Sequence, residues 1–153
     1  MGTNYYLKRI PTRQEVEKTK KLLDEGRIES YAGLFSYDPE KDMSAQDMIC
    51  EMTKSIHIGK FSGGWEFCFR VNDEYYSKSF DDVYRFIGNA IQSGEWKFIN
   101  EYGENIELDD FIQKVNKTKG GLNFKSNPSK YHFTEDYDTM SPDGSWWCSV
   151  DFC

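Results

Sequence analysis

Residues 56–69, IHIGKFSGGWEFCF, combine residue types that could bind an anion. One histidine, one lysine, one serine and two adjacent glycines lie between two runs that are typical of β-strands. The lysine supplies a positive charge, the hydroxyl and imidazole supply adaptable hydrogen bonds, and glycines let backbone N–H groups point at a ligand. The candidate ligand-binding residues of this segment are His57, Lys60, Ser62, Gly63, Gly64 and Trp65.

An alternative interpretation of the same segment needs no ligand. Gly63 and Gly64 could serve a tight turn that requires positive φ, and Lys60 could protect a sheet edge. The segment also lacks the spacing of a P-loop and precedes a strand where a P-loop precedes a helix. Turn geometry, however, needs neither a histidine nor a lysine, so both interpretations stay open.

The N-terminal segment contains a second group of candidate ligand-binding residues. Thr3, Asn4, Tyr5 and Tyr6 place an aromatic pair beside an amide, which could stack on and hydrogen-bond a base or a sugar. This requires that the N-terminal strand lies next to the hairpin. Tyrosines in a strand also serve amphipathic packing, which is the alternative.

The two histidines match a known phosphoesterase pattern only in part. His132 begins a His-x-Thr pattern like that of two-histidine phosphoesterases, but His57 is followed by Ile58 and Gly59 and lacks the matching hydroxyl. Both copies are needed to position a phosphate and exchange protons. Signatures of serine or cysteine acyl transfer are also absent from the sequence, so it favours a non-enzymatic protein with no catalytic residues.

An acidic cluster lies near the C-terminus. Glu135, Asp136 and Asp138 could bind a divalent cation or meet a basic partner, but their spacing is not that of a calcium loop. A solvated charged loop is the simpler interpretation, and we predict no metal site. In an alternating strand, one of Trp146 and Trp147 should face the core and the other the outside.

Composition limits the classes of partner. A net charge of −7 argues against direct binding of nucleic acid or of anionic membranes, because affinity for a polyanion comes largely from Lys and Arg. An acidic surface could instead occupy a basic groove on another protein. The four cysteines form no Cys-x-x-Cys pair, and the N-terminus has no signal-peptide core, so we expect a cytoplasmic protein without cofactors. Homo-oligomerisation is compatible with the sequence.

Hydrophobic periodicity and turn residues predict an α+β fold in one domain spanning residues 1–153. We expect a mainly antiparallel sheet with three to four helices packed on one face, and a core rich in aromatic residues, which make up 16% of the chain. The predicted helices span residues 13–25, 45–54, 80–94 and 108–116. The predicted strands span residues 3–10, 30–35, 55–60, 65–71, 74–78, 96–100, 122–125, 131–134 and 145–152.

Three short blocks resemble a family of small bacteriophage and prophage proteins. These blocks are MGTNYYL, the HIGK-FS-GGW hairpin and NEYGENIELDDFIQKV. Many members carry a Cys-Pro-x-Cys element between the first strand and the hairpin, whereas this chain has a capped helix there and no cysteine pair. The resemblance therefore implies a phage context without implying zinc.

Two functional hypotheses follow. The first is a phage-type accessory protein that binds a nucleotide-like or phosphorylated small molecule through the hairpin and the N-terminal strand, and so sequesters a host antiviral signal. The second is an acidic, anti-CRISPR-like inhibitor that binds a host defence protein through the acidic cluster. In a phage, either protein would act in the cytoplasm of the host cell.

Overall fold

The computed structural model of the chain describes residues 2–29, 38–123 and 138–149. The chain divides into two compact units, one formed by Lys8–Ser55 and the other by the segments before and after it. Each unit buries a hydrophobic cluster of its own.

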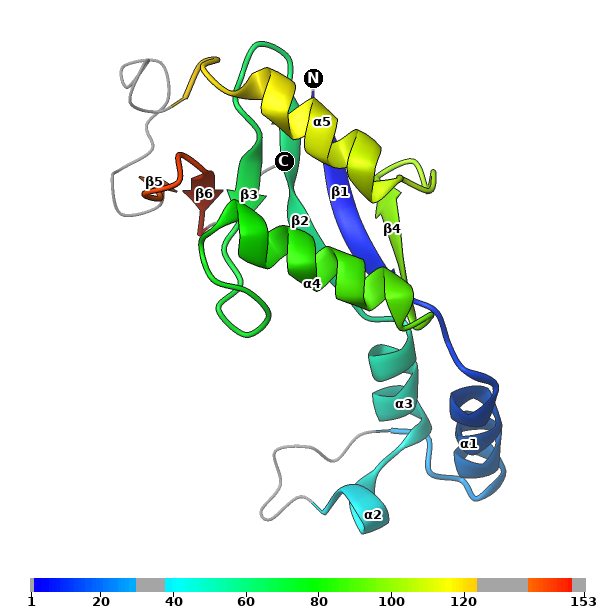
Figure 1. The fold of residues 1–153 in the computed structure, drawn as a ribbon. Coiled ribbons are helices and arrows are strands. Elements are labelled where there is room, and N and C mark those ends of the chain that lie inside the picture. Colours follow the sequence, from blue (N-terminus) through cyan, green and yellow to red (C-terminus); the bar gives the residue numbers. More distant parts are fainter. Residues whose placement is uncertain (1, 30–37, 124–137, 150–153) are drawn as a thin grey trace. The chain divides into compact units, whose positions relative to one another are not determined.

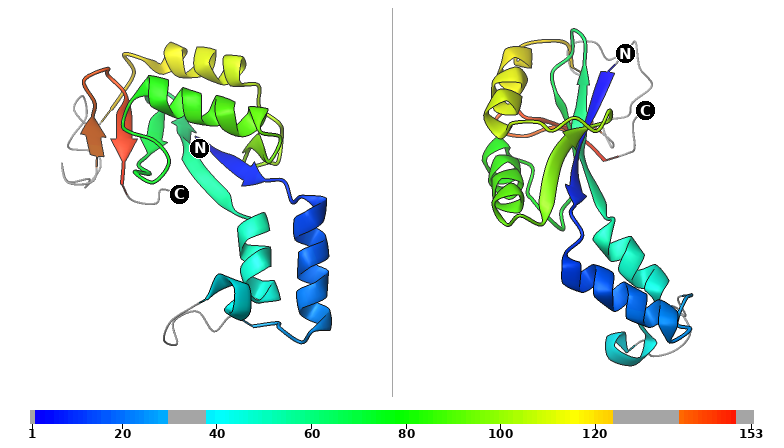
Figure 2. Two further views of the ribbon diagram at one scale, coloured as in Figure 1. Left: turned by 60° about the horizontal axis from the view of Figure 1, so that its bottom comes forward. Right: turned by 90° about the vertical axis from the view of Figure 1, so that its right-hand side faces the viewer.

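The larger unit is built on a six-stranded sheet with the strand order β4-β1-β2-β3-β6-β5 (Figure 1). Helices α4 (Phe80–Gln92) and α5 (Leu108–Thr118) both lie against one face of this sheet (Figure 2). The predicted α+β class is therefore confirmed. The strands are β1 Gly2–Arg9, β2 Ser55–Ser62, β3 Cys68–Arg70, β4 Trp96–Asn100, β5 Asp138–Met140 and β6 Trp146–Cys148.

Strand pairing is mostly antiparallel, as predicted. β2 pairs antiparallel with β3, β3 pairs parallel with β6, and β6 pairs antiparallel with β5. The backbone N–H of Arg9 donates to the carbonyl of Lys54 at 2.9 Å, whereas Gly2 lies beside Lys60 and Ser62. β1 and β2 are therefore antiparallel neighbours, so the N-terminal strand lies next to the hairpin as the ligand hypothesis required.

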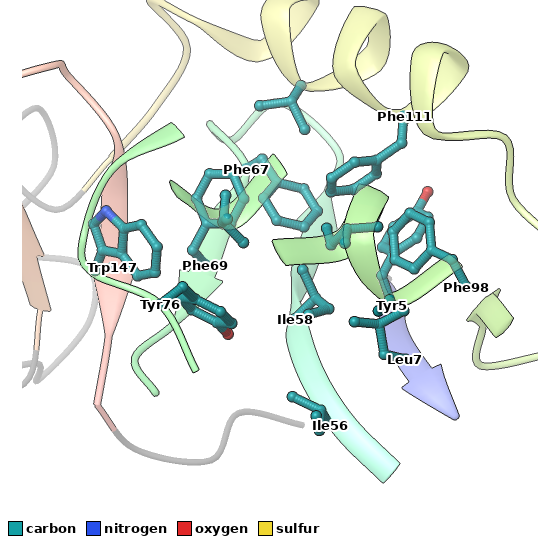
Figure 3. Close-up of a cluster of buried hydrophobic side chains, with 14 residues drawn as sticks. Tyr5, Leu7, Ile56, Ile58, Phe67, Phe69, Tyr76, Phe98, Phe111 and Trp147 are labelled. Atoms are coloured by element: carbon teal, nitrogen blue, oxygen red, sulfur yellow. The ribbon is translucent and has the colours of Figure 1, made fainter. Parts of the chain in front are cut away.

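The core between the sheet and the two helices is largely aromatic (Figure 3). The ring of Phe111 on α5 lies 5.2 Å from Tyr5, 5.1 Å from Phe67 and 4.9 Å from Phe98, measured between centroids. Trp147 is fully buried and Trp146 is half-buried, which confirms that one of the pair faces the core. Large rings supply much of the buried area of this unit.

Helix α4 begins with two side-chain caps. The hydroxyl of Ser79 accepts from the Asp82 N–H at 3.1 Å, and the Asp143 carboxylate accepts from the Phe80 N–H at 2.7 Å. Burial alone would raise the pKa of Asp143, but hydrogen bonds from Ser145 and from the Phe80 N–H outweigh it and lower that pKa. The loop between β5 and β6 is thus tied to the start of α4.

The smaller unit is helical. It consists of α1 (Arg13–Asp24), α2 (Pro39–Asp42) and α3 (Ala45–Met52), of which α2 was not predicted. Both α1 and α3 begin with a capping box, formed by Thr12 with Glu15 and by Ser44 with Asp47. Leu22, Ala45 and Met48 form the buried cluster that holds the unit together.

Glu15 stabilises the start of α1 through interactions with both Thr12 and Arg9. Its carboxylate accepts from the Thr12 N–H at 3.0 Å and pairs with Arg9 at 2.7 Å. The Thr12 backbone bond, partly opposed by burial and supported by the Thr12 hydroxyl and Arg9, lowers the pKa of Glu15. The start of α1 is therefore fixed by a charge-assisted network.

The helices of the described residues are short. α4 has 13 residues and α1 has 12, and none of the helices in this part of the chain is long and apolar enough to cross a membrane.

One predicted strand is wrong. Residues 74–78 form turns and bends because the carbonyl of Asn72 accepts from the N–H groups of both Tyr75 and Tyr76, at 3.1 Å each. Tyr76 is buried and packs against Phe86 of α4. Tyr75 and Tyr76, which are β-forming residues, therefore pack against the core although they do not lie in a strand.

The returning strand of the hairpin is shorter than predicted. β3 begins at Cys68, and Phe67 and Phe69 are core residues, whereas Trp65 is not. Trp65 instead forms a β-bridge with Leu122 and stacks on Trp146, with centroids 5.9 Å apart. The strands predicted at 30–35 and 131–134 lie outside the described residues.

Candidate functional site

The alternation of β1 and β2 divides the predicted site residues between two faces of the sheet. Tyr5 is buried among the core residues on the helix side, and Thr3 alternates to the same side. Asn4 and Tyr6 point the other way, as does His57, which lies between the buried residues Ile56 and Ile58. The predicted quartet at 3–6 therefore does not act as one group.

Tyr5 requires a correction. Its side chain is only 3% exposed, so its ring cannot stack on a ligand as predicted. Its hydroxyl instead accepts a hydrogen bond of 3.0 Å from the ammonium of Lys114 on α5. Tyr5 thus orients the ammonium of Lys114, and the sequence did not predict this contact.

A chain of hydrogen bonds crosses the face opposite α4 and α5. The amide nitrogen of Asn4 donates to Glu101 at 3.2 Å, and the amide oxygen of Asn4 lies 3.1 Å from Nε2 of His57. A carboxylate only accepts, so the amide nitrogen must face Glu101 and the amide oxygen must face His57. It follows that Nε2 of His57 carries the proton in this contact.

The imidazole of His57 is also held by stacking. The ring of Tyr6 lies on it with centroids 4.8 Å apart and an interplanar angle of 23°. Asn4, which orients the edge of the imidazole, is 8% exposed. Stacking and hydrogen bonding together fix the plane and the tautomer of His57.

Lys60 and Ser62 lie on the same face as His57, beside Gly2, because the alternation of β2 shifts by one residue at Gly59, where a Cβ would meet the core ring of Phe67. A Cβ at Gly2 would come within 2.6 Å of Lys60 Cε and 2.8 Å of Ser62 Oγ, so both side chains fold over this glycine. Neither the ammonium of Lys60 nor the hydroxyl of Ser62 has a hydrogen bond or ion pair within the part of the chain that the structure describes. We call Asn4, Tyr6, His57, Lys60 and Ser62 the polar sheet face.

The glycines of the hairpin have structural roles. Gly64 has φ of 81°, and the Trp65 N–H donates to the Ser62 carbonyl at 3.0 Å, which closes a tight turn. A Cβ at Gly59 would lie 2.4 Å from the carbonyl oxygen of Cys68, so β2 and β3 approach closely only with glycine there. Gly63 has neither constraint. A role of Gly63 and Gly64 in ligand binding stays a prediction.

A groove of about 650 Å³ lies on the helix side of the hairpin, between its end and α5. Of the predicted residues only Gly64 and Trp65 line it, and the sequence analysis did not identify its cations on α5. We call it the α5 groove. Its lining consists of Phe61, Gly64, Trp65, Asp110, Gln113, Lys114, Lys117, Thr118 and Gly121.

The acidic cluster is largely untested. Glu135, Asp136 and His132 lie outside the described residues, and Asp138 is the first residue of β5, with Cys148 as its partner on β6. The protein-inhibitor hypothesis therefore stays a prediction. Within residues 2–29, 38–123 and 138–149, no group of three or more His, Cys, Asp or Glu side chains is arranged to hold a metal ion.

Comparison of the chain with protein-family models, with curated proteins and with solved structures found no match. The function is therefore argued from the geometry of the two regions.

Proposed function

We propose that the protein is a non-catalytic binding protein that holds a nucleotide-like or other phosphorylated small molecule on the polar sheet face. The observation that carries the proposal is the pairing of β1 with β2, which gathers Lys60, Ser62 and an oriented His57 on one side of the sheet. Thr3 and Tyr5 lie on the other side and have no part in it.

Lys60 and Ser62 are the groups that contact the phosphate in this proposal. An ammonium offers three donors and a full charge, and a hydroxyl donates where an anion requires it. The Cε of Lys60 and the Oγ of Ser62 both lie beside Gly2, and in this proposal the two side chains bind the same oxyanion. Neither side chain makes another hydrogen bond or ion pair in the described residues, so ligand binding breaks no bond of theirs within that part of the chain.

His57 contributes through its fixed orientation. Glu101 orients the amide of Asn4, the amide orients the imidazole, and Tyr6 holds the plane of the ring. A side chain that is already ordered loses less entropy when a ligand binds. The network thus supports a binding role for the histidine without any proton transfer.

The resemblance to phage proteins suggests the setting. In an infected cell, a small protein that binds a nucleotide-like signal without converting it would lower the free concentration of that signal. We propose that sequestration of a host antiviral signal is the biological use of this binding.

Two measurements test the proposal. Purified protein is heat-denatured and the released small molecules are identified by mass spectrometry, and the native protein is then titrated with linear and cyclic nucleotides. A ligand of the native state raises the melting temperature as its concentration rises. Absence of any released nucleotide, together with no stabilisation by any member of the panel, would overturn the proposal.

Substitutions locate the site. Lys60→Met and Ser62→Ala should each weaken binding of the nucleotide found in this way, by about tenfold for the lysine because a charge-assisted bond is lost. Lys97→Met removes the same charge from an exposed position on β4 and should leave affinity unchanged. Equal affinity of the Lys60→Met protein and the unaltered protein would exclude the polar sheet face as the site.

A further inference from the structure

The polar wall of the α5 groove comes from one stripe of the helix. Asp110, Gln113, Lys114 and Lys117 line the groove and follow the spacing i, i+3, i+4 and i+7. The opposite stripe, with Phe111 and Val115, is buried in the core. Packing of the apolar stripe therefore directs the polar stripe along the end of the hairpin.

The facing wall is aromatic. Phe61 and Trp65 line it, and Trp65 is held by its stacking on Trp146. Phe61 packs against the core on the helix side, whereas Lys60 and Ser62 lie on the other side of the same strand. The α5 groove is thus a different place from the polar sheet face.

Hydrogen bonds tie the two walls together. The Leu122 N–H donates to the Gly64 carbonyl at 3.0 Å, and the Glu66 N–H donates to the Leu122 carbonyl at 2.8 Å. The Phe67 N–H donates to the hydroxyl of Thr118 at 2.9 Å. The hairpin end and the C-terminal end of α5 are therefore fixed relative to each other, and the groove exists before any ligand enters.

The groove carries a local positive charge on an acidic chain. Its lining holds two ammonium groups and one carboxylate, whereas the chain as a whole has a net charge of −7. Lys114 is fixed by the Tyr5 hydroxyl at 3.0 Å and lies 4.7 Å from the centroid of Phe61. Lys117 makes no hydrogen bond or ion pair in the described part of the chain.

The position of Lys117 in the last turn also suits the negative end of the helix dipole. The helix dipole accounts for Lys117. It does not account for Lys114, which lies one turn earlier in α5 and contacts Tyr5 and Phe61, nor for the aromatic wall of the groove. A cation fixed beside an aromatic ring is the arrangement that recognises a ligand with a flat ring and a negative charge.

We infer that the α5 groove is a second binding site, for a small planar aromatic anion. The ring lies against Phe61 and Trp65, and the anionic group lies between Lys114 and Lys117. The volume of about 650 Å³ falls in the range of small-molecule pockets, about 300–1,000 Å³. This inference does not depend on the proposed function of the polar sheet face.

The test uses the full chain labelled with ¹⁵N and phenyl phosphate as the probe. Binding should shift the indole signal of Trp65 and the amide signals of Gly64, Lys117 and Gly121. Lys114→Met and Lys117→Met should each weaken the affinity about tenfold, because each removes a charge-assisted bond. Lys97→Met, which removes the same charge elsewhere, should have no effect.

Two further probes define the ligand class: inorganic phosphate, which has no ring, and benzyl alcohol, which has no charge. Inorganic phosphate and benzyl alcohol should each bind more weakly than phenyl phosphate. Phe61→Leu keeps an apolar side chain but removes the ring face, and should weaken phenyl phosphate while leaving inorganic phosphate unchanged. Inorganic phosphate that binds as tightly as phenyl phosphate would overturn the aromatic class, and absence of the four shifts would overturn the site.

The same spectra separate this inference from the proposed function. Lys60→Met should leave phenyl phosphate binding in the groove unchanged. If a nucleotide from the panel loses affinity in Lys117→Met and keeps it in Lys60→Met, the polar sheet face is excluded and the groove is supported. If the nucleotide instead loses affinity in Lys60→Met and keeps it in Lys117→Met, the polar sheet face is supported as the nucleotide site. The inference about the groove is then decided by the binding of phenyl phosphate.

Discussion

The polar sheet face and the α5 groove lie on opposite sides of one hairpin and are built in different ways. On the sheet face, side chains from paired strands hydrogen-bond one another, as Asn4 does with His57 and Glu101. In the groove, backbone bonds between the hairpin end and α5 fix the walls, and the side chains of Lys117 and Trp65 project into the space between them. On the sheet face, contacts between side chains fix the orientation of His57, whereas in the groove backbone bonds fix the position of the walls.

This difference teaches how each region should respond to substitution. Removing one member of a hydrogen-bonded network leaves its partners unsatisfied, so it costs stability as well as binding. Removing Lys117, which makes no hydrogen bond or ion pair in the described residues, leaves no buried group unpaired, so it should cost binding alone. Stability and affinity should therefore change together when Asn4 is replaced on the sheet face, and affinity alone should change when Lys117 is replaced in the groove.

The largest expected effect would break both regions at once. Phe111→Ala deletes a ring that packs against Tyr5, Phe67 and Phe98, and should lower the free energy of unfolding by about 3–5 kcal/mol. Urea denaturation measures the loss, with Asn116→Ala, an exposed position on the same helix, as the control. A loss below about 1 kcal/mol would show that α5 is not held by this cluster.

An intermediate effect should be confined to the sheet face. Asn4→Ala leaves Nε2 of His57 and one oxygen of Glu101 without their partner, which should cost about 1–3 kcal/mol of unfolding free energy. Nucleotide binding on the sheet face should weaken with it. Phenyl phosphate binding in the groove, measured by NMR titration, should not change, and an equal loss at both sites would contradict their independence.

The smallest effect should be confined to the groove. Tyr5→Phe removes only the hydroxyl that accepts from Lys114, at a cost of about 1 kcal/mol in the free energy of unfolding. Lys114 keeps its charge but loses its fixed position, so phenyl phosphate should bind about threefold more weakly. Tyr102→Phe, at a side chain that is 72% exposed, is the matched control. Unchanged affinity would mean that Tyr5 does not position the lysine.

Local signals in the sequence predicted much of the fold. The helices predicted at 13–25, 45–54 and 80–94 and the strand predicted at 96–100 each depend on near neighbours in the chain, and each is found there as α1, α3, α4 and β4. The strand predicted at 74–78 failed because burial of Tyr76 against α4 is a tertiary effect, which local propensity does not contain.

The candidate site was predicted less completely. The pairing of β1 with the hairpin was a condition of the ligand hypothesis, and the structure meets it, but strand alternation sends Tyr5 and Tyr6 to opposite faces and so divides the quartet at 3–6. The groove was missed because Trp65 and Lys117 are far apart in the chain. The polar stripe from Asp110 to Lys117 was the only signal available for it.

The link between Arg9 and Lys54 has a consequence for how such a chain can evolve. Their backbone hydrogen bond of 2.9 Å brings together the points where the helical segment leaves β1 and returns to β2. A segment whose ends meet in this way can be exchanged for another without moving the strands that flank it. The position between these two strands is thus one at which a small module can be exchanged while the pairing of β1 with β2 stays intact.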